Sequence, residues 1–514
     1  MTGRLPKSDK EEAGFRVLLS VCLGTLMSAL DASVVNTVLP VIRTEYHVSV
    51  GVIQWVSTSY LLVMGSLLLT FGRLGDLRGH KPVYLAGLAI FVPASTLCGF
   101  APSVDTLIAA RVLQGVGAAI VVSSTPAILI GSVHPSRTGQ LLGLQAAITG
   151  IGLALGPSLG GWLTDQWGWR TIFFLNVPIG LAAIAMGVRH IPGEKDRRPR
   201  EETFDWIGAL LFLGAFLGLQ VALNLGNDWG WLSPQTLGLF AGSAALGYLF
   251  LHQETIAKSP MLHLALFRNR IFTFSVGSAL VNYICFASIL FLVPFYLIQG
   301  RGFSATKGGL IMTAQFLSMV VAAPISGKIA DRVGNRGPAT LGMAIMAIGL
   351  FLLSAMKGGS PLHLVVIGLA VTGLGGSIFA TPNNSAMLGA APPGRKGIAS
   401  GILATSRLMG MATGFTLAGT VLAVIAGGRS EQGIPPEQVF QAIHIGFLAA
   451  GFLALGGTLL TAARGLNGSE PWEPSLREAE NRFGKKLPTM NGAGRYSTWP
   501  RASGRTGKSS SDMP

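Results

Sequence analysis

Hydrophobic residues gather along this chain into long, almost unbroken runs that short polar segments separate. Fourteen such runs lie at approximately 17–39, 52–71, 82–101, 106–130, 139–163, 171–191, 206–225, 235–252, 272–298, 307–327, 338–356, 362–388, 397–426 and 440–463. About twenty apolar residues in a helix cross the hydrocarbon core of a bilayer, so each run is predicted to be one transmembrane span. Lipid offers no hydrogen-bond partner to a bare backbone, so the spans are expected to be helices. The runs do not show the short alternation of a transmembrane barrel.

The composition fits a membrane protein better than a soluble one. Of the 514 residues, 50% are hydrophobic and 12% are charged, whereas about a quarter of the residues in soluble domains are charged. The 69 glycines suit closely packed membrane helices. All three cysteines fall inside apolar runs and are expected to be small buried residues, which argues against a disulfide scaffold. The first apolar run is long enough to span and does not read as a cleaved signal peptide.

Basic residues are distributed unevenly about the predicted spans. The spans are numbered 1 to 14, and each loop takes the number of the span that it follows. If the N-terminus is cytoplasmic, 30 of the 38 Lys and Arg residues lie on the cytoplasmic side, in the even loops and the two terminal segments, and six lie in the odd loops. The positive-inside rule therefore places both termini in the cytoplasm and the protein in the cell (inner) membrane. The same asymmetry explains the net charge of +15 without a nucleic-acid partner.

The sequence also repeats itself over a long distance. The residues Gly72, Asp76, Gly79 and Lys81 are matched 255 residues later by Gly327, Asp331, Gly334 and Arg336. A second pattern, which begins at Arg137, recurs 258 residues later. Two similar halves that meet near the membrane midplane are typical of transporters. The alternative is a duplicated helical bundle that has no transport pathway.

The predicted fold class is an all-α integral membrane protein in which two six-helix bundles flank two inserted helices. Its expected parts are a cytoplasmic N-terminus (1–16), an N-terminal bundle (17–191), a linker with two inserted helices (192–271), a C-terminal bundle (272–464) and a disordered cytoplasmic tail (465–514).

Three charged residues lie well inside the predicted spans, namely Asp31, Arg111 and Arg407. A charge inside a membrane is costly and is therefore a hypothesis of function. At a rise of about 1.5 Å per residue, Asp31 in span 1 and Arg111 in span 4 lie at similar depths and are expected to face each other. Burial favours the neutral acid and a nearby arginine favours the carboxylate, so Asp31 is a candidate proton carrier. The alternative is a permanent ion pair that clamps two helices.

Several chemistries find no support in the sequence. The P-loop of ATP-driven pumps and the HExxH and GxSxG motifs of hydrolases are absent from it, and potential metal ligands do not cluster. The chain is therefore not expected to be an enzyme or to carry a metal or other cofactor. Transport against a gradient would then depend on an ion gradient. Asp31 is the single acid well inside a span, which makes the proton the expected coupling ion.

The motifs together resemble those of the fourteen-span drug:proton antiporters of the major facilitator superfamily, over essentially all of residues 15–464. The sequence LDASVVNTVLP at 30–40 is similar to that family's first-span signature, which includes its proton-responsive acid, and WVSTSYLL at 55–62 is also typical. The sequence RVLQG at 111–115 resembles a span 4 motif whose arginine assists proton transfer. The resemblance implies the major facilitator fold and a role in multidrug efflux.

Two further motifs carry the resemblance. The sequence GRLGDLRGHK is similar to the superfamily's cytoplasmic gating motif, which implies gating roles for Gly72, Gly75, Asp76, Arg78, Gly79 and Lys81, and for Gly327, Asp331, Gly334 and Arg336 in the repeat. Otherwise the segment is a solvated basic turn that only sets topology. The sequence GLALGPSLGG resembles the span 5 antiporter motif, with Gly152, Gly156, Pro157, Gly160 and Gly161. Small residues at this spacing form a close-packed helix face, and the proline adds a kink. The connection from Trp167 to Pro178 also resembles the family's and is interpreted as structural.

Polar and aromatic residues inside the spans are candidates for the wall of a substrate cavity. They are Asn36, Tyr60, Gln114, Asn282, Tyr283, Phe286, Gln315, Asn383, Asn384 and Arg407. Each of them could instead make a helix–helix contact, and for Arg407 a helix clamp and a substrate contact are equally favoured. Spans 9 to 14 contain no internal acid, unlike relatives that expel dications. Neutral, anionic or singly charged amphipathic substrates are therefore expected.

The predicted function is secondary active export, in which amphipathic drugs or other small organic compounds leave the cytoplasm in exchange for protons by alternating access. The alternative is a dedicated exporter of one endogenous metabolite, such as an antibiotic or siderophore. The expected partners are the substrate, protons and the lipid bilayer. The sequence does not decide whether periplasmic or outer-membrane efflux partners join them. A membrane-embedded enzyme or lipid-handling scaffold would need a catalytic pair, and Asp31 with Arg111 lacks a nucleophile.

Overall fold

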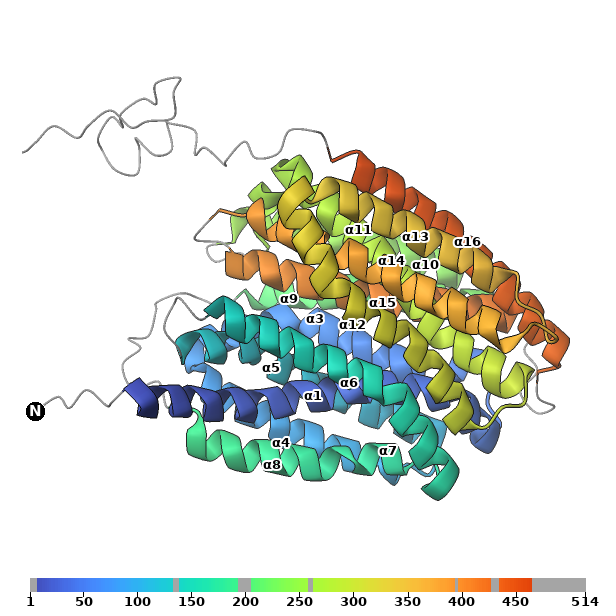
Figure 1. The fold of residues 1–514 in the computed structure, drawn as a ribbon, viewed down its shortest axis with the longest axis horizontal. Helices are drawn as coiled ribbons and strands as arrows, with labels where there is room; N and C mark the ends of the chain where they lie inside the picture. Colours follow the sequence, from blue (N-terminus) through green and yellow to red (C-terminus); the bar gives the residue numbers. More distant parts are fainter. Residues whose placement is uncertain are drawn as a thin grey trace, which may run out of the picture. The chain divides into compact units, whose positions relative to one another are not determined.

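The computed structural model describes residues 7–132, 138–192, 205–257, 262–392, 396–426 and 434–464, and every regular element among them is helical. The elements, labelled as in Figure 1, are α1 (Lys7–Tyr46), α2 (Val50–Ile53), α3 (Trp55–Arg78), α4 (His80–Gly99), α5 (Val104–Gly131), α6 (Thr138–Trp167), α7 (Thr171–Phe174), α8 (Asn176–His190), α9 (Trp206–Trp229), α10 (Pro234–Ile256), η2 (Leu264–Arg268), α11 (Arg270–Pro294), η3 (Phe295–Gly300), α12 (Ala305–Val333), α13 (Arg336–Ser354), α14 (Leu362–Gly389), α15 (Lys396–Ala426) and α16 (Pro436–Ala462). The predicted C-terminal tail (465–514) and the first six residues lie outside the described residues.

Each predicted span coincides with a long helical segment, in three cases made of two consecutive elements. Span 2 is formed by α2 with α3, span 6 by α7 with α8, and span 9 by α11 with η3. Within the described residues, twelve of these segments are long and apolar enough to cross a membrane, whereas α6 and α10 fall outside that measure. An all-helical chain with many spans is thus confirmed, and the total of fourteen spans stays a prediction.

The sequence repeat is matched by a repeat in helix packing. In the first half α1 packs against α6, α3 against α5, and α4 against α5 and α8. In the second half the corresponding helices form the same pairs: α11 with α15, α12 with α14, and α13 with α14 and α16. Because the two halves bury equivalent faces of equivalent helices, each forms a bundle of six long segments.

The two bundles meet along a few helices. The main contacts between them join α6 to α12 and α3 to α15, and α1 also touches α11. The interface between the halves is therefore lined by helices from spans 1, 2, 5, 9, 10 and 13.

The two ends of the helices are named by the loops that they carry. The odd-loop end carries the odd-numbered loops, and the even-loop end is the opposite one.

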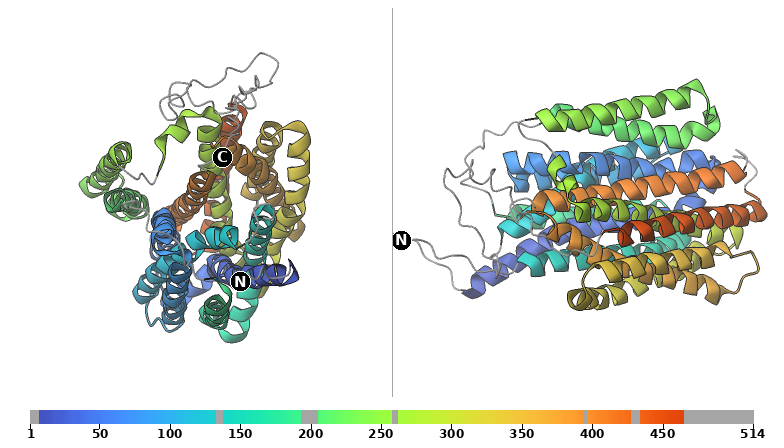
Figure 2. Two further views of the ribbon diagram at one scale, coloured as in Figure 1. Left: turned by 90° about the vertical axis from the view of Figure 1, so that its left-hand side faces the viewer. Right: turned by 90° about the horizontal axis from the view of Figure 1, so that it is seen from above.

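The inserted helices α9 and α10 lie together beside this interface, as both views in Figure 2 show. Helix α9 packs on α3 of the first bundle and on α15 of the second, and α10 packs on α9. The Gln220 side chain on α9 is fully buried; its Nε2 donates to Thr413 Oγ1 at 2.9 Å, and its Oε1 accepts from Thr416 Oγ1 at 2.8 Å. Polar bonds therefore attach α9 to the second bundle.

Candidate functional site

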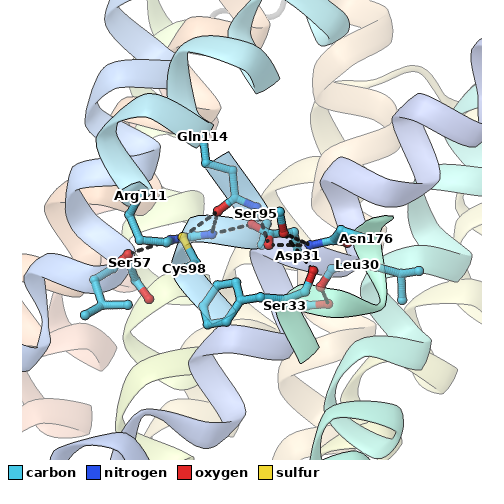
Figure 3. A network of polar contacts seen from close by, with 12 residues as sticks. Leu30, Asp31, Ser33, Ser57, Ser95, Cys98, Arg111, Gln114 and Asn176 are labelled. Carbon is cyan, nitrogen blue, oxygen red and sulfur yellow. Dashed lines mark hydrogen bonds and ion pairs between the residues drawn. The ribbon is translucent and has the colours of Figure 1, made fainter. Parts of the chain in front are cut away.

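A buried carboxylate in the first bundle lies at the centre of a network of hydrogen-bond donors (Figure 3). Asp31 on α1 accepts from Arg111 Nη1 at 2.5 Å through Oδ2, and from Gln114 Nε2 at 2.9 Å through Oδ1. Oδ1 also accepts from Asn176 Nδ2 at 2.9 Å. All four side chains are at most 3% exposed. Helices α1, α5 and α8 thus bring three donors to one carboxylate, and each of them favours its charged form.

A second set of contacts holds these donors in place. Arg111 also donates through Nη1 to Gln114 Oε1 at 2.7 Å and through Nε to the Val56 carbonyl at 2.9 Å, and its guanidinium lies 4.1 Å from the centre of the Tyr60 ring. Asn176 Nδ2 donates to Ser95 Oγ at 3.0 Å, and that hydroxyl donates to the Phe173 carbonyl at 2.8 Å. The arginine charge is therefore shared between Asp31, a helix carbonyl and an aromatic face.

The structure brings together Asp31, Arg111, Gln114 and Tyr60, all of which the sequence singled out. It adds Asn176, which was missed because residues 167–178 were interpreted as a structural connection, and Ser95 on α4, which no motif singled out. A signal was available, since Asn176 is an amide at the start of the apolar run of span 6. A buried amide in a membrane helix must find partners, and those partners are Asp31 and Ser95 here.

The remaining candidate in the first bundle, Asn36, connects two helices. Asn36 Oδ1 accepts from Ser57 Oγ at 2.6 Å, and Asn36 Nδ2 donates to the Ala32 carbonyl. Asn36 therefore joins α1 to α3.

Two polar candidates in the second bundle, Asn282 and Asn383, make contacts within that bundle, and Gln315 is buried there. Asn282 Nδ2 lies 3.0 Å from the Met346 sulfur on α13, and Asn383 Nδ2 donates to the Ser275 carbonyl on α11 at 3.2 Å. Gln315 lies on the face of α12 that packs against α14, since Gly373 of α14 abuts the Gln315 carbonyl. Its buried amide has no hydrogen-bond partner among the described residues.

The other four candidates in the second bundle have no side-chain hydrogen bond among the described residues. The Phe286 ring meets the Phe316 ring edge to face at 6.1 Å, and Tyr283 packs beside Gly410. Asn384 and Arg407 are half-buried. Arg407 has neither a hydrogen bond nor an ion pair within the described part of the chain.

The gating motif and its repeat build the same corner in both halves. Gly79 ends α3 with φ +91°, and Gly334 ends α12 with φ +83°, conformations that favour glycine. Lys81 then donates to the carbonyls of Val188 and Ile191 at the end of α8, at 2.9 and 2.6 Å. Arg336 donates to the Ala462 carbonyl at the end of α16. Each basic residue therefore closes the C-terminus of its bundle's last helix, where a positive charge is favoured.

Within the first corner the other motif residues also pack closely. Gly75 leaves room for the His80 ring, which would meet any Cβ placed there. His80 Nε2 lies 3.3 Å from Asp76 Oδ1, and the Asp76 side chain is 51% exposed. Gly72 lies beside Ser123 of α5, and Arg78 ends α3. In the repeat, Gly327 lies beside Thr381 of α14, and Asp331 is exposed near the end of α12.

The glycines of the span 5 motif let α6 approach two helices. Gly152, Gly156 and Gly160 face α1, where an added Cβ would collide with Ala29, Ser33 and Val34 respectively. Gly161 abuts the backbone of Ala305 on α12, and Gly309 of α12 abuts the Pro157 carbonyl. One face of α6 therefore belongs to the first bundle and another forms the interface with the second bundle.

Contacts close this interface at the odd-loop end. Asp165, near the end of α6, accepts from the Ala305 and Thr306 N–H groups at 3.2 and 2.8 Å and from the Thr306 hydroxyl at 2.6 Å, so it caps α12 from the other bundle. Partial burial opposes the charge of Asp165, but these hydrogen bonds outweigh it and lower the pKa of its carboxyl. Ser158 also bonds Thr313 across the interface.

The even-loop end of the interface is different. An added Cβ at Gly150 of α6 would meet no atom, and one at Gly327 of α12 would meet only its own bundle. Figure 1 shows α6 and α12 diverging in this direction. The described helices α5 and α6 do not pack extensively against α14 or α15, whereas α3 and α15 stay together as far as Leu69 and Gly401. The halves are thus joined at the odd-loop end and apart along α6 and α12 at the even-loop end.

Comparison with known proteins identifies this architecture. A family model described as the Major Facilitator Superfamily matches residues 21–306 and 275–500. The chain belongs to the major facilitator superfamily. Members of this superfamily are transporters, which confirms the expectation that the chain is not an enzyme.

Two curated relatives in this superfamily are transport or resistance proteins. The chain is 34% identical to the riboflavin transporter RibZ of Clostridioides difficile (strain 630), over 77% of this chain and 86% of the relative. It is also 34% identical to the multidrug resistance protein Stp of Mycobacterium tuberculosis (strain ATCC 25618 / H37Rv), over 79% of this chain and 75% of the relative. The chain is therefore a multi-pass membrane transporter similar to the superfamily's drug-efflux members.

A solved structure shares the fold. A bacterial homologue of the human lysosomal transporter Spinster, in an inward-facing and unoccupied conformation, superposes with a TM-score of 0.64 over 90% of this chain and 98% of that one, at 13% identity. The likeness confirms the major facilitator fold. Within the described residues no three His, Cys, Asp or Glu side chains gather as a metal ion would require.

Proposed function

We propose that this protein is a secondary active exporter that exchanges external protons for amphipathic drugs or other small organic compounds from the cytoplasm. The observation that carries the proposal is the buried Asp31 carboxylate, which accepts from Arg111, Gln114 and Asn176. Such a group has two distinct states. The carboxylate holds all three donors, and the neutral acid holds them less strongly, because charge-assisted hydrogen bonds are about twice as strong as neutral ones.

The proton step follows from this geometry. A proton arriving from outside neutralises Asp31 and releases part of the hold on Arg111, whose guanidinium keeps the Val56 carbonyl and the Tyr60 ring as partners. Helices α1, α5 and α8 can then shift relative to one another, which changes how the first bundle meets the second. Loss of the proton on the cytoplasmic side restores the three bonds. The cell's proton gradient supplies the driving force, and no cofactor is involved.

The state described corresponds to an inward-facing exporter in this proposal. We assign fourteen spans, place the odd-loop end outside and both termini in the cytoplasm of a cell (inner) membrane, on the basis of the positive-inside rule. The contacts of Asp165 and of the α6 glycines then close the outer side. The separation of α6 from α12 at the even-loop end opens a way in for cytoplasmic cargo. The inward-facing Spinster homologue has the same fold.

The proposal is tested by transport in proteoliposomes with an imposed pH gradient and a panel of cationic, neutral and anionic fluorescent compounds. Asp31→Asn keeps the size of the side chain but cannot release a proton, so proton-driven accumulation should fall to the level of empty vesicles while compounds still bind. Asp105→Asn, which alters an exposed acid in the first turn of α5, is the matched control and should transport normally. Full-rate pumping by Asp31→Asn against a gradient would rule out the assigned role.

A dedicated exporter of one endogenous metabolite is the second candidate. The relative RibZ is described as a riboflavin transporter, so single-compound transport occurs close to this chain in sequence. Transport of many unrelated compounds in the panel supports the multidrug function. If the protein transports none of these compounds but does transport a metabolite extracted from the cell that makes this protein, the result supports the dedicated exporter. Activity of the purified chain alone in proteoliposomes would show that it needs no efflux partner.

A further inference from the structure

Of the three charged residues well inside the predicted spans, Arg407 is the one that the rest of the described structure does not neutralise. Asp31 and Arg111 form an ion pair and cancel each other. Arg407 has no hydrogen-bond or ion-pair partner among the described residues, and its side chain is half-buried. The sequence left open whether this arginine clamps helices. With no partner, a clamp finds no support in the structure.

The contacts of α15 define which way Arg407 points. Gly401 and Leu408 face α3, while Gly410 and Gly414 face α11. The threonines at 413, 416 and 420 face α9. With about 3.6 residues per turn, Arg407 falls on the side of α15 roughly opposite the threonines, between the α3 face and the α11 face. It therefore points away from the inserted helices and toward the region where the two bundles meet.

The position of Arg407 along the helix supports the same conclusion. It lies close to the middle of the apolar segment Gly397–Ile425. An unpaired arginine that faces lipid at this depth is costly, and charged residues in spans almost always face the bundle interior or a water-filled space. The region between the halves is the space that the separation of α6 from α12 opens toward the even-loop end. Arg407 thus provides a net positive charge on the route between the bundles.

We propose that Arg407 binds the acidic group of an amphipathic organic anion, and that compounds of this class are the protein's cargo. This inference rests on the proposed export function and narrows its substrate. A guanidinium matches a carboxylate or a sulfonate with two parallel hydrogen bonds, and such charge-assisted pairs are the stronger ones. Tyr283 on the neighbouring α11 packs beside Gly410 of α15 and is half-buried, so its ring is an apolar surface for the rest of the molecule. The unpaired charge also disfavours cations on the same route.

The test is equilibrium binding to the purified full chain in detergent, without any gradient. The probes are dansyl-labelled aromatic compounds, each prepared as a free carboxylic acid and as the primary amide of the same size. The wild type should bind the acids at least about tenfold more tightly than the amides, as expected for hydrogen bonds to a charged group. Arg407→Gln should remove this preference by weakening the acids alone. Arg407→Lys should retain part of it.

The matched control is Lys357→Gln, which removes one exposed positive charge from the same bundle and should leave the preference intact. Because Arg407 has no partner to lose among the residues that the structure describes, Arg407→Gln should also keep the wild-type melting temperature. Equal binding of acid and amide by the wild type on every scaffold, or an equal loss of both in Arg407→Gln, overturns the proposal. The assay needs no proton gradient, so Arg407-dependent binding of anions would support this inference even if the proteoliposomes show no proton-driven export. Proton-driven export of cations alone would overturn this inference and leave the proposed export function in place.

Discussion

At the residue scale, the site consists of one carboxylate and the donors that surround it. Arg111 is the charged partner, but Asp31 Oδ1 is shared by two amides, Gln114 and Asn176. Amide donors stabilise the carboxylate without adding net charge, and they lose most of that interaction when the acid is neutral. The two amides therefore hold the carboxylate in place, and the ion pair with Arg111 is the switch in the proposed mechanism.

Asn176→Ala removes one of the three donors to the Asp31 carboxylate. We expect proton-driven transport to fall by about tenfold, since a hydrogen bond to a charged group contributes about 1.5–3 kcal/mol and about 1.4 kcal/mol corresponds to a factor of ten. The measurement is the initial transport rate in proteoliposomes with an imposed pH gradient. Asn282→Ala is the control, because that amide contacts methionine sulfurs in the other bundle. An unchanged rate in Asn176→Ala would remove the amide from the proposed coupling mechanism.

At the scale of elements, helix termini connect parts of the chain that are far apart. Lys81 and Arg336 each close the last helix of their own bundle, whereas Asp165 caps the first turn of α12 from the other bundle. The first two bonds lie within a bundle and can persist as the bundles move. The Asp165 bonds cross between bundles, so they exist only while the odd-loop end is closed.

Asp165→Ala should therefore shift the protein toward states with an open odd-loop end. Positions 167 and 307 are both exposed and can carry spin labels. Double electron–electron resonance would report the change as a larger population of long distances between the two labels. Asp165→Asn retains an acceptor and should show a smaller shift. Identical distance distributions in the wild type and both variants would mean that the cap has no part in closure.

The response of this cap to pH follows from the lowered pKa of Asp165. A carboxyl group whose pKa is depressed by its bonds contributes fully above its ordinary value of 3.8, and this contribution is lost as the pH falls through the lowered value. External pH between about 5 and 7 should thus leave the 167–307 distance unchanged in the Asp31→Asn variant, where coupling is removed. Opening in that range would assign a pH response to a group other than Asp165.

At the scale of the whole molecule, the proposed export cycle requires the two bundles to come together closely and separate again. At the odd-loop end, α6 and α12 approach so closely that backbone meets backbone, at Gly161 with Ala305 and at Gly309 with Pro157. Such contacts depend on shape and tolerate no added atom, since packed interiors leave few voids. The inserted α9 is bonded to α15 and only packs on α3, so it is expected to move with the second bundle.

Gly161→Ala places a methyl group against the Ala305 backbone and should prevent full closure of the odd-loop end. We expect transport to fall by at least about tenfold, because about 1.4 kcal/mol of strain in one state is enough for that change. Gly150→Ala is the matched control on the same helix, where the added methyl group meets open space. Equal transport by the two variants would show that this contact is not needed for the cycle.

The sequence by itself determined the helical spans, the repeat and the two charges of the central pair. These features follow from local composition: apolar runs of sufficient length, charged residues within them and glycines at matching positions can all be read from the linear chain. The gating corner was also foreseeable, since Gly79 and Gly334 occur with a basic residue two positions later in both halves.

Only the tertiary structure decided which polar residues meet. Asn176 reaches Asp31 across 145 positions, while Asn282 and Asn383 turn into their own bundle although they were candidates for the same role as Gln114. A span's sequence states which residues it carries but not how the helix is rotated about its axis, and that rotation is set by packing against neighbours far along the chain. The same packing leaves Arg407 without a partner among the described residues and holds the odd-loop end closed through Asp165, because both results depend on how the two bundles face each other.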